Sequence, residues 1–489
     1  MLKCLYIKHR GFFMLTPVYH PDYLVNAPQW LRNLDCVMDN IKRKKQTYLP
    51  NLGAIPPEAK TDPKVTALAA KIEKDWEDLT WRLANYVNIV NPTMNAITGA
   101  VMRREPEFDT MDNPVLIGLR DNLDGKGNGI DQECKQALNA LQWGSRCGWL
   151  VRSHPESATM ADWNKGKKLP TAAFYDALHI IDWEVEYIDG EEKLTYLSLL
   201  EDYQDRDGGT YVSKQRLINH RLVNGLCEYQ EVTDDEYTDE WTPVLISGKQ
   251  SDTIPFFLVS SQSNEWCIDS TPLTSLAEIS LSIYVMNAYS NKAMILANEA
   301  KWHVDMGEMD KTMASEMNPL GFTLAGRMPY YTKGGSVNVV QAQFSPETEN
   351  KVEKLFEQAV KVGASLFTQQ SNETATGAAI RSGASTASMA TLGNNVEDTA
   401  RNMLRFIMRY FEGTNLYVNP DELVFKLNRD YFDVPVDTQL IQTMYGAYLE
   451  AALPEQDWFN LLKKARILRG DDTYESWQER IADAGRGLV

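Results

Sequence analysis

The chain has 489 residues, of which 43% are apolar and 24% charged, so it is long enough to bury a large core and has the composition of a globular protein. Twelve Trp and 22 Tyr residues argue against intrinsic disorder. The formal net charge of −18 excludes a broad basic surface of the kind that gives non-specific affinity for nucleic acid.

The N-terminus does not have the pattern of a signal peptide, because Lys8, His9 and Arg10 interrupt its apolar stretch and no small-residue cleavage site follows. Met14 is a plausible alternative start, so residues 1–13 are interpreted as a tail or a misassigned start. No apolar run approaches the roughly 18 residues that a membrane-spanning helix needs, and we expect no membrane partner.

The region from 27 to 105 is predicted to be helical, with apolar side chains at helical spacing and prolines at 92 and 106 as breaks. Its stripe consists of Val65, Leu68, Ile72, Trp76 and Leu79. Three glycines at 125, 127 and 129 then predict a turn before another helix, whose apolar face carries Ile130, Cys134, Leu138 and Leu141. No strand is predicted before these glycines, which argues against a dinucleotide site.

Residues 170–260 have the composition of strands. The pairs Asp189-Gly190 and Asn224-Gly225 stand between β-rich runs and predict two hairpins. The acidic cluster at 234–240 is interpreted as a solvated loop, because it lacks the spacing of a calcium-binding loop.

The next segments alternate between long helices and turn-rich sequence. A helix is predicted at 271–300 with the apolar stripe Leu273, Leu276, Ile279, Ile283 and Met286, followed by a mixed insert at 301–344. Ser345 and Pro346 then predict the start of a second helix that reaches about 367. A stretch of small residues, "SNETATGAAIRSGASTASMATLGNN", leads into a third helix at 385–411, and two further helices separated at Pro454 are expected near the end.

No catalytic constellation is visible in the sequence. The six histidines form no H-x-x-x-H or H-E-x-x-H pair, and there is no G-x-S-x-G or Walker-A motif. The six cysteines form no C-x-x-C pair and are interpreted as reduced structural thiols. We therefore expect no enzymatic activity, no catalytic or metal-binding residues and no cofactor.

Four blocks together resemble the portal (head-to-tail connector) proteins of tailed bacteriophages. They are "NPTMNAITGAVMRREPEF", "NLDGKGNGIDQECKQALNALQWGSRCGWLV", "LTSLAEISLSIYVMNAYSNKA" and "ETATGAAIRSGASTASMATLGNNVEDTARNMLRFIMRYFEG", and they extend from about 90 to 413. Their order and spacing carry the resemblance, since no single block is diagnostic. The chain departs from the pattern at Gly148–Arg152, where an acidic residue is expected after the Val, and around Gly377.

The resemblance implies an α+β, mainly helical portal fold. Its parts would be an N-terminal wing region at 1–270, stem helices at 271–300 and 345–367, a clip at 301–344, a tunnel loop at 368–384, a spine helix at 385–411, and a C-terminal wing strand with crown helices at 412–489.

The implied function is structural. The protein would form a ring of about twelve copies at one capsid vertex of the virion, assembled in the host cytoplasm, and would conduct DNA during packaging and ejection. The implied partners are further copies of itself, double-stranded DNA, the terminase large subunit, the major capsid or scaffold protein, and head-tail adaptor or tail proteins.

The resemblance also implies three sets of site residues. The DNA-channel candidates are Gln369, Gln370, Asn372, Thr374, Thr376 and Arg381. The subunit-interface candidates on the first stem helix are Leu276, Ile279, Ile283 and Met286, and the candidates for docking a motor or adaptor are Lys311, Glu316 and Arg327.

Nearly uncharged polar side chains suit a channel through which a polyanion must slide, because strong ion pairs would hold it back. An exposed linker between two helices explains the same composition equally well. Two other functions also remain open: another phage structural or scaffold-associated protein without a channel, and a cytoplasmic enzyme whose site is not visible in the sequence.

Overall fold

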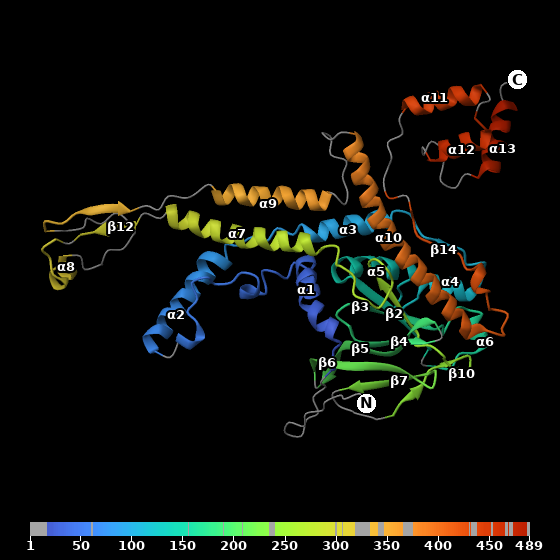
Figure 1. Ribbon diagram of the computed structural model, residues 1–489, viewed down its shortest axis with the longest axis horizontal. Helices are drawn as coiled ribbons and strands as arrows, with labels where there is room; N and C mark the ends of the chain where they lie inside the picture. The colour runs from blue at the N-terminus through green and yellow to red at the C-terminus, as the bar shows by residue number, and fades with distance from the viewer. Residues whose placement is uncertain are drawn as a thin grey trace. The chain divides into compact units, whose positions relative to one another are not determined.

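The structure is a computed structural model with helices and strands in one chain, so the fold is α+β as predicted (Figure 1). It describes residues 17–486 except 60–61, 155, 189, 208, 234–239, 299–300, 306, 318–332, 341–346, 365–374, 430, 432–437, 451–452, 465–467 and 469–472. The chain forms two compact units, one up to Arg429 and one from Asp430 onward.

The first unit contains ten α-helices among its described residues. They are α1 (Pro21–Val37), α2 (Pro63–Trp76), α3 (Val90–Val101), α4 (Pro114–Asp121), α5 (Ile130–Gly144), α6 (Met160–Trp163), α7 (Thr274–Asn298), α8 (Lys311–Met317), α9 (Glu347–Ala364) and α10 (Ala375–Met408). A π-helical turn, η3 (Glu77–Trp81), continues α2.

Most strands belong to two antiparallel sheets. A five-stranded sheet has the order β4 (Ile180–Ile188), β5 (Glu191–Asp207), β6 (Thr210–Val223), β7 (Leu226–Thr233) and β8 (Thr242–Pro243), and a three-stranded sheet has the order β11 (Phe256–Ser260), β2 (Arg146–Arg152) and β3 (Thr171–Asp176). The remaining strands pair as β1 (Glu107–Phe108) with β14 (Phe425–Lys426), β9 (Leu245–Ile246) with β10 (Lys249–Gln250), and β12 (Lys301–Val304) with β13 (Val337–Val340).

The two predicted hairpins are confirmed. Asn224 and Gly225 have φ values of 53° and 76°, the left-handed conformation that a two-residue type I′ turn requires, and they join β6 to β7. β4 and β5 pair with Ile188 opposite Glu191, so their turn lies at 189–190 as expected.

Helix α5 lies at the centre of the first unit. Its predicted apolar face is confirmed, since Ile130, Cys134, Leu138 and Leu141 have no solvent exposure. α5 packs on α1, α3, α4 and α10 and on strands β2, β3 and β11, so helices and sheet meet around one helix.

Helix α10 begins ten residues earlier than the sequence predicts. The segment 375–384, expected to belong to the tunnel loop at 368–384, is helical from Ala375. The alanines at 375, 378, 379 and 384 are strong helix formers, and they offset a cost of about 1 kcal/mol for each of Gly377 and Gly383 inside the helix.

A buried carboxylate fixes the C-terminal half of α10. Glu397 is 2% exposed, and its Oε1 lies 2.6 Å from Nη2 of Arg401 and 3.3 Å from Nη2 of Arg429. Its Oε2 accepts a hydrogen bond of 2.9 Å from the N–H of Leu427. The carboxylate therefore joins α10 to the segment that follows β14, and its three partners compensate the cost of burying its charge.

The second unit is a small helical bundle formed by α11 (Thr438–Leu449), α12 (Glu455–Lys464) and α13 (Tyr474–Arg486). The predicted break at Pro454 is confirmed, but a third helix follows the two expected ones. Its start is fixed by reciprocal hydrogen bonds between Thr473 and Ser476. Trp458, Phe459 and Trp477 form the apolar cluster of this unit.

We predict that Glu397→Gln lowers the free energy of unfolding by about 2–3 kcal/mol, because it removes the charge that balances Arg401 and Arg429. Urea unfolding followed by tryptophan fluorescence measures the change. Asp398→Asn is the matched control: its carboxylate is 60% exposed and also pairs with Arg401, and we expect a loss below about 0.5 kcal/mol. Equal losses in the two variants would contradict the role assigned to Glu397.

Candidate functional site: the helical arm and the charged pocket

Two features of the first unit are candidate functional sites. The first is the helical arm, which consists of α7, α9 and the insert between them. α7 and α9 pack along each other, and β12, α8 and β13 lie where α7 ends and α9 begins (Figure 1). In the insert, β12 and β13 pair from Lys301–Val340 to Val304–Val337. The insert is thus a small antiparallel strand pair with the helix α8 between its two strands in the sequence, and it lies at one end of a helix pair.

The insert is closely packed backbone just beyond the Val304–Val337 end of its strand pair, which is the end far from α7 and α9. A Cβ atom at Gly335 would clash with the carbonyl of Asp305, and one at Gly307 would clash with the carbonyl of Lys333. Gly307 also has a φ of 60°, which disfavours other residues. These two glycines let the segments 305–307 and 333–335, which follow β12 and precede β13, lie in contact.

The structure corrects part of the predicted subunit interface. Leu276 and Ile283 are 1% and 2% exposed and lie inside the chain, on a helix that packs against α1, α3, η3 and α9. They are not free to contact another subunit. Ile279 and Met286 are half-buried. Helical periodicity identified an apolar face correctly, but it cannot distinguish a face covered by the same chain from one covered by another copy.

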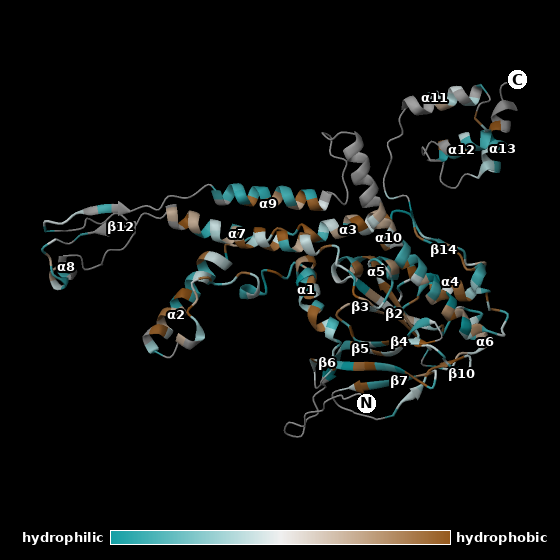
Figure 2. Cartoon of the chain, in the orientation of Figure 1, coloured by the Kyte–Doolittle hydropathy of each residue, from teal (hydrophilic) through white to brown (hydrophobic). Residues whose placement is uncertain are grey.

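Other apolar side chains of the arm are exposed instead. Met294 and Ile295 on α7 are 36% and 38% exposed, and Val360 on α9 is 58% exposed. Figure 2 shows α9 as the more hydrophilic of the two helices, which makes Val360 an exception on its surface. These three residues replace Leu276 and Ile283 as candidates for contact with a neighbouring subunit.

The other predicted residues fall in different places. Lys311 and Glu316 lie on α8 in the insert and are exposed, whereas Arg327 lies outside the described residues. Gln369, Gln370, Asn372 and Thr374 also lie outside them. Thr376 and Arg381 belong to α10, and their side chains are outside the described part of the chain.

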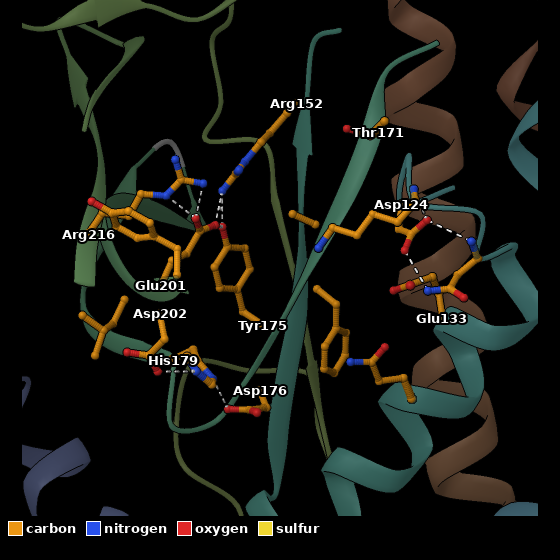
Figure 3. A pocket seen from close by; sticks show the side chains of 17 residues that line it. Asp124, Glu133, Arg152, Thr171, Tyr175, Asp176, His179, Glu201, Asp202 and Arg216 are labelled. Atoms are coloured by element: carbon orange, nitrogen blue, oxygen red, sulfur yellow. Dashed lines mark hydrogen bonds and ion pairs between the residues drawn. The ribbon is translucent and has the colours of Figure 1, made fainter. Parts of the chain in front are cut away.

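The second feature is a pocket of about 650 Å³ that sequence analysis missed. Figure 3 shows its charged side chains, which come from β2, β3, the turn after β3, β5, β6 and the loop before α5. The pocket forms where segments that are distant in the sequence pair with one another. A correct prediction of the β5–β6 register would have placed Glu201 opposite Arg216, and this is the signal that could have pointed to the pocket.

Glu201 is the centre of an ion-pair network in this pocket. Its Oε1 lies 2.6 Å from Nη2 of Arg152, its Oε2 lies 2.6 Å from Nη2 of Arg216, and the hydroxyl of Tyr175 donates to it. Burial by itself would raise the pKa of Glu201, but Arg152, Tyr175 and Arg216 outweigh that effect and the pKa lies below its ordinary value. The carboxylate is therefore charged and neutralises much of the local positive charge.

His179 lies between two carboxylates at the turn after β3. Its Nδ1 is 2.6 Å from Oδ1 of Asp176, and its Nε2 is 3.8 Å from Oδ2 of Asp202. Burial lowers the pKa of His179, but the hydrogen bond to Asp176 and the charges of Asp176 and Asp202 outweigh it, so the net direction is upward.

Glu133 contributes a second buried carboxylate, from α5. It accepts a hydrogen bond of 3.0 Å from Nε1 of Trp149, and burial raises its pKa to about 7. No hydroxyl or thiol hydrogen-bonds to His179 among the described residues, so the pocket there offers charged and hydrogen-bonding groups without a paired nucleophile.

The described residues also exclude two kinds of site. They contain no group of three or more His, Cys, Asp or Glu side chains placed to hold a metal ion. None of their helices is long and apolar enough to cross a membrane.

We predict that protonated His179 stabilises the fold at low pH. Its folded pKa is raised above the value of about 6.5 in the unfolded chain, so its contribution is complete below that pH and is lost as the pH rises through the folded pKa. His179→Gln should therefore lower the melting temperature more at about pH 5.5 than at about pH 9, as measured by differential scanning fluorimetry.

Asp176→Asn is the control for this effect, since it removes the main partner that stabilises protonated His179. In an Asp176→Asn background, His179→Gln should lower the melting temperature by more similar amounts at the two pH values. A loss in His179→Gln that stays constant over the whole pH range would contradict the assignment.

Comparison with known proteins gives limited similarity. The family described as "Domain of unknown function (DUF4055)" matches residues 272–411, from the start of α7 to the end of the helical turn after α10. No curated protein matches the chain. Two solved structures are similar to it at 12% identity, each covering 76% of this chain and 89% of the other: "Virion of native gene transfer agent (GTA) particle", with a TM-score of 0.39, and "Neck of empty GTA particle computed with C6 symmetry", with a TM-score of 0.38.

Proposed function

We propose that this chain is a structural protein of a phage or phage-like virion and forms the portal ring at one capsid vertex. The observation that carries the proposal is the order of elements from Thr274 to Met408. The segment begins with a long helix, which is followed by a small insert with an antiparallel strand pair and one helix. A second helix, packed on the first, and a third long helix come next, and no sheet domain interrupts this order. The DUF4055 match covers the same segment, which supports treating it as one evolutionary unit.

The proposal gives each part of this segment a task. The α7–α9 pair would be the stem, the insert with α8 would be the clip, and α10 would be the spine helix. Repetition of one chain around an axis brings unlike surfaces of neighbouring copies into contact and closes a ring when the rotation permits. The first turns of α10 would then approach the channel.

The charge of the chain is compatible with this task. Duplex DNA carries one negative charge per roughly 1.7 Å of its axis, and cationic side chains bind it by releasing counterions. A chain with a net charge of −18 repels the duplex over most of its surface, so DNA could pass without being held. DNA would be a passing cargo, with no sequence-specific contact.

The remaining partners follow from the same proposal. The terminase large subunit would dock on the insert, where Lys311 and Glu316 are exposed, and adaptor or tail proteins would use the same end after packaging. Capsid or scaffold proteins would contact other parts of the first unit. The protein itself would have no catalytic activity, and the ATP hydrolysis needed for packaging would belong to the motor.

We predict that the purified chain assembles into a ring of about twelve copies with a central hole. Mass photometry measures the number of subunits, and negative-stain electron microscopy shows whether a hole is present. A particle that remains a monomer or dimer at all concentrations, including in the presence of a scaffold or capsid protein, would contradict the proposal.

We predict that Val360→Asp reduces ring formation but leaves the monomer folded. Val360 is exposed within the chain, so a charge there harms only a contact with another copy. Gln358→Asp adds the same charge at a neighbouring exposed position of α9 and should keep the ring.

Ile283→Asp provides the opposite contrast, because it buries an unpaired charge inside the chain and should destabilise the monomer itself. Mass photometry combined with circular dichroism separates the three variants. If Val360→Asp still forms intact rings, this face of α9 does not belong to the interface between subunits.

A further inference from the structure

We propose that the edge of β3 at Phe174 binds an extended, lysine- or arginine-bearing segment of another protein chain as an added strand. This inference goes beyond the proposed ring function and does not depend on it. It rests on three observations: open backbone groups on β3, a pocket that follows them, and the charge of that pocket.

The first observation is the direction of the backbone groups of β3. β3 is an edge strand, because the three-stranded sheet has the order β11-β2-β3. The N–H of Ala172 points away from β2 and donates to the carbonyl of Leu123 at 2.9 Å. N–H groups alternate between the two sides of an antiparallel strand, so the N–H of Phe174 also points away from β2. Within the described residues, no hydrogen bond reaches the N–H of Phe174.

The second observation is that space lies along this edge. The pocket of about 650 Å³ is lined by residues 173–176 of β3 on one side and by residues 200–203 of β5 on the other. β5 pairs with β4 only as far as Leu199, and the N–H of Leu200 still bonds to the carbonyl of His179. The cavity between these two strands has the size that binds small ligands or short peptides.

The third observation is the charge of the pocket. The positive charges of Arg152 and Arg216 are directed at Glu201. Asp124, Asp176 and Asp202 also line the pocket, and the carboxylate of Asp124 accepts hydrogen bonds from the N–H groups of Lys126 and Asn128.

The other groups that face this space are Lys126, His179 and Glu133. Counted together, the pocket lining has five carboxylates and four basic groups, an excess of one carboxylate. A strand with cationic side chains complements this distribution better than an acidic one.

An added strand satisfies both conditions at once. Its backbone would donate and accept hydrogen bonds at Phe174, as peptides do when they extend the edge of a sheet. Alternate side chains of a strand point to the same face, so cationic residues at every second position would reach the carboxylates. A small anion or a second copy of this acidic chain lacks this match.

Peptide binding to the full-length chain tests the proposal. The probe is a fluorescein-labelled heptapeptide of alternating valine and lysine, and fluorescence anisotropy measures its affinity. We expect saturable binding that weakens as salt is added. A counterpart with glutamate in place of lysine, and a lysine peptide with N-methylated backbone amides, should each bind at least about ten-fold more weakly.

Two variants of one residue separate backbone pairing from side-chain packing. Phe174→Pro removes the outward N–H without removing a bond to β2, whereas Phe174→Val keeps the N–H and shortens the side chain. We expect Phe174→Pro to weaken binding by about ten-fold and Phe174→Val by less than about three-fold. Circular dichroism and melting temperature establish that both variants are folded.

Hydrogen exchange of the unaltered protein provides a measurement that needs no variant. The lysine peptide should slow exchange of the Phe174 amide and leave the amides of β11 unchanged. The proposal is overturned if the lysine peptide shows no saturable binding up to about 1 mM, if the glutamate peptide binds equally well, or if bound peptide leaves exchange at Phe174 unaltered.

Discussion

The buried ion pair and hydrogen bond made by Glu397 are the interactions on which the arrangement of the first unit depends. They hold α10 against the chain segment at 425–429. From that position α10 buries Val396, Ala400 and Met403 completely, and it packs on α3, α5 and β11. Glu397 makes its ion pairs and its hydrogen bond in the same register of α10 that buries this apolar face.

The same core supports the base of the arm. The N–H of Leu273 donates to the carbonyl of Gln142 at the end of α5, and the first turns of α7 bury Leu276 and Ala277. α5 thus contacts α10 and also anchors the start of α7. This arrangement explains why the predicted interface residues are internal: the base of α7 is a core helix. Exposed apolar side chains lie elsewhere on the arm, at Met294, Ile295, Met313 and Val360.

Sequence patterns predicted what depends on neighbouring residues. The face of α5 and the turn at Asn224-Gly225 follow from local periodicity and from the φ values that a tight hairpin demands. The early start of α10 is not evident from the sequence, because Gly377 and Gly383 interrupt a stretch that its alanines make helical. The pocket was missed for a different reason, since Arg152, His179 and Glu201 meet only after three strands have paired, and one sequence does not reveal such pairing.

The two edges of the three-stranded sheet differ in what covers them, and this difference supports a binding role for the edge at β3. An exposed edge is a liability, because it offers unpaired backbone groups to any other chain, and folded proteins usually cover it. β11 is covered by α10, to which the side chains of Asn264, Asn395 and Thr399 add hydrogen bonds. β3 instead faces a cavity in which carboxylates outnumber basic groups by one. In a chain that already carries a net charge of −18, this lining repels further acidic segments, including those of its own copies, and so leaves the edge accessible mainly to basic ones.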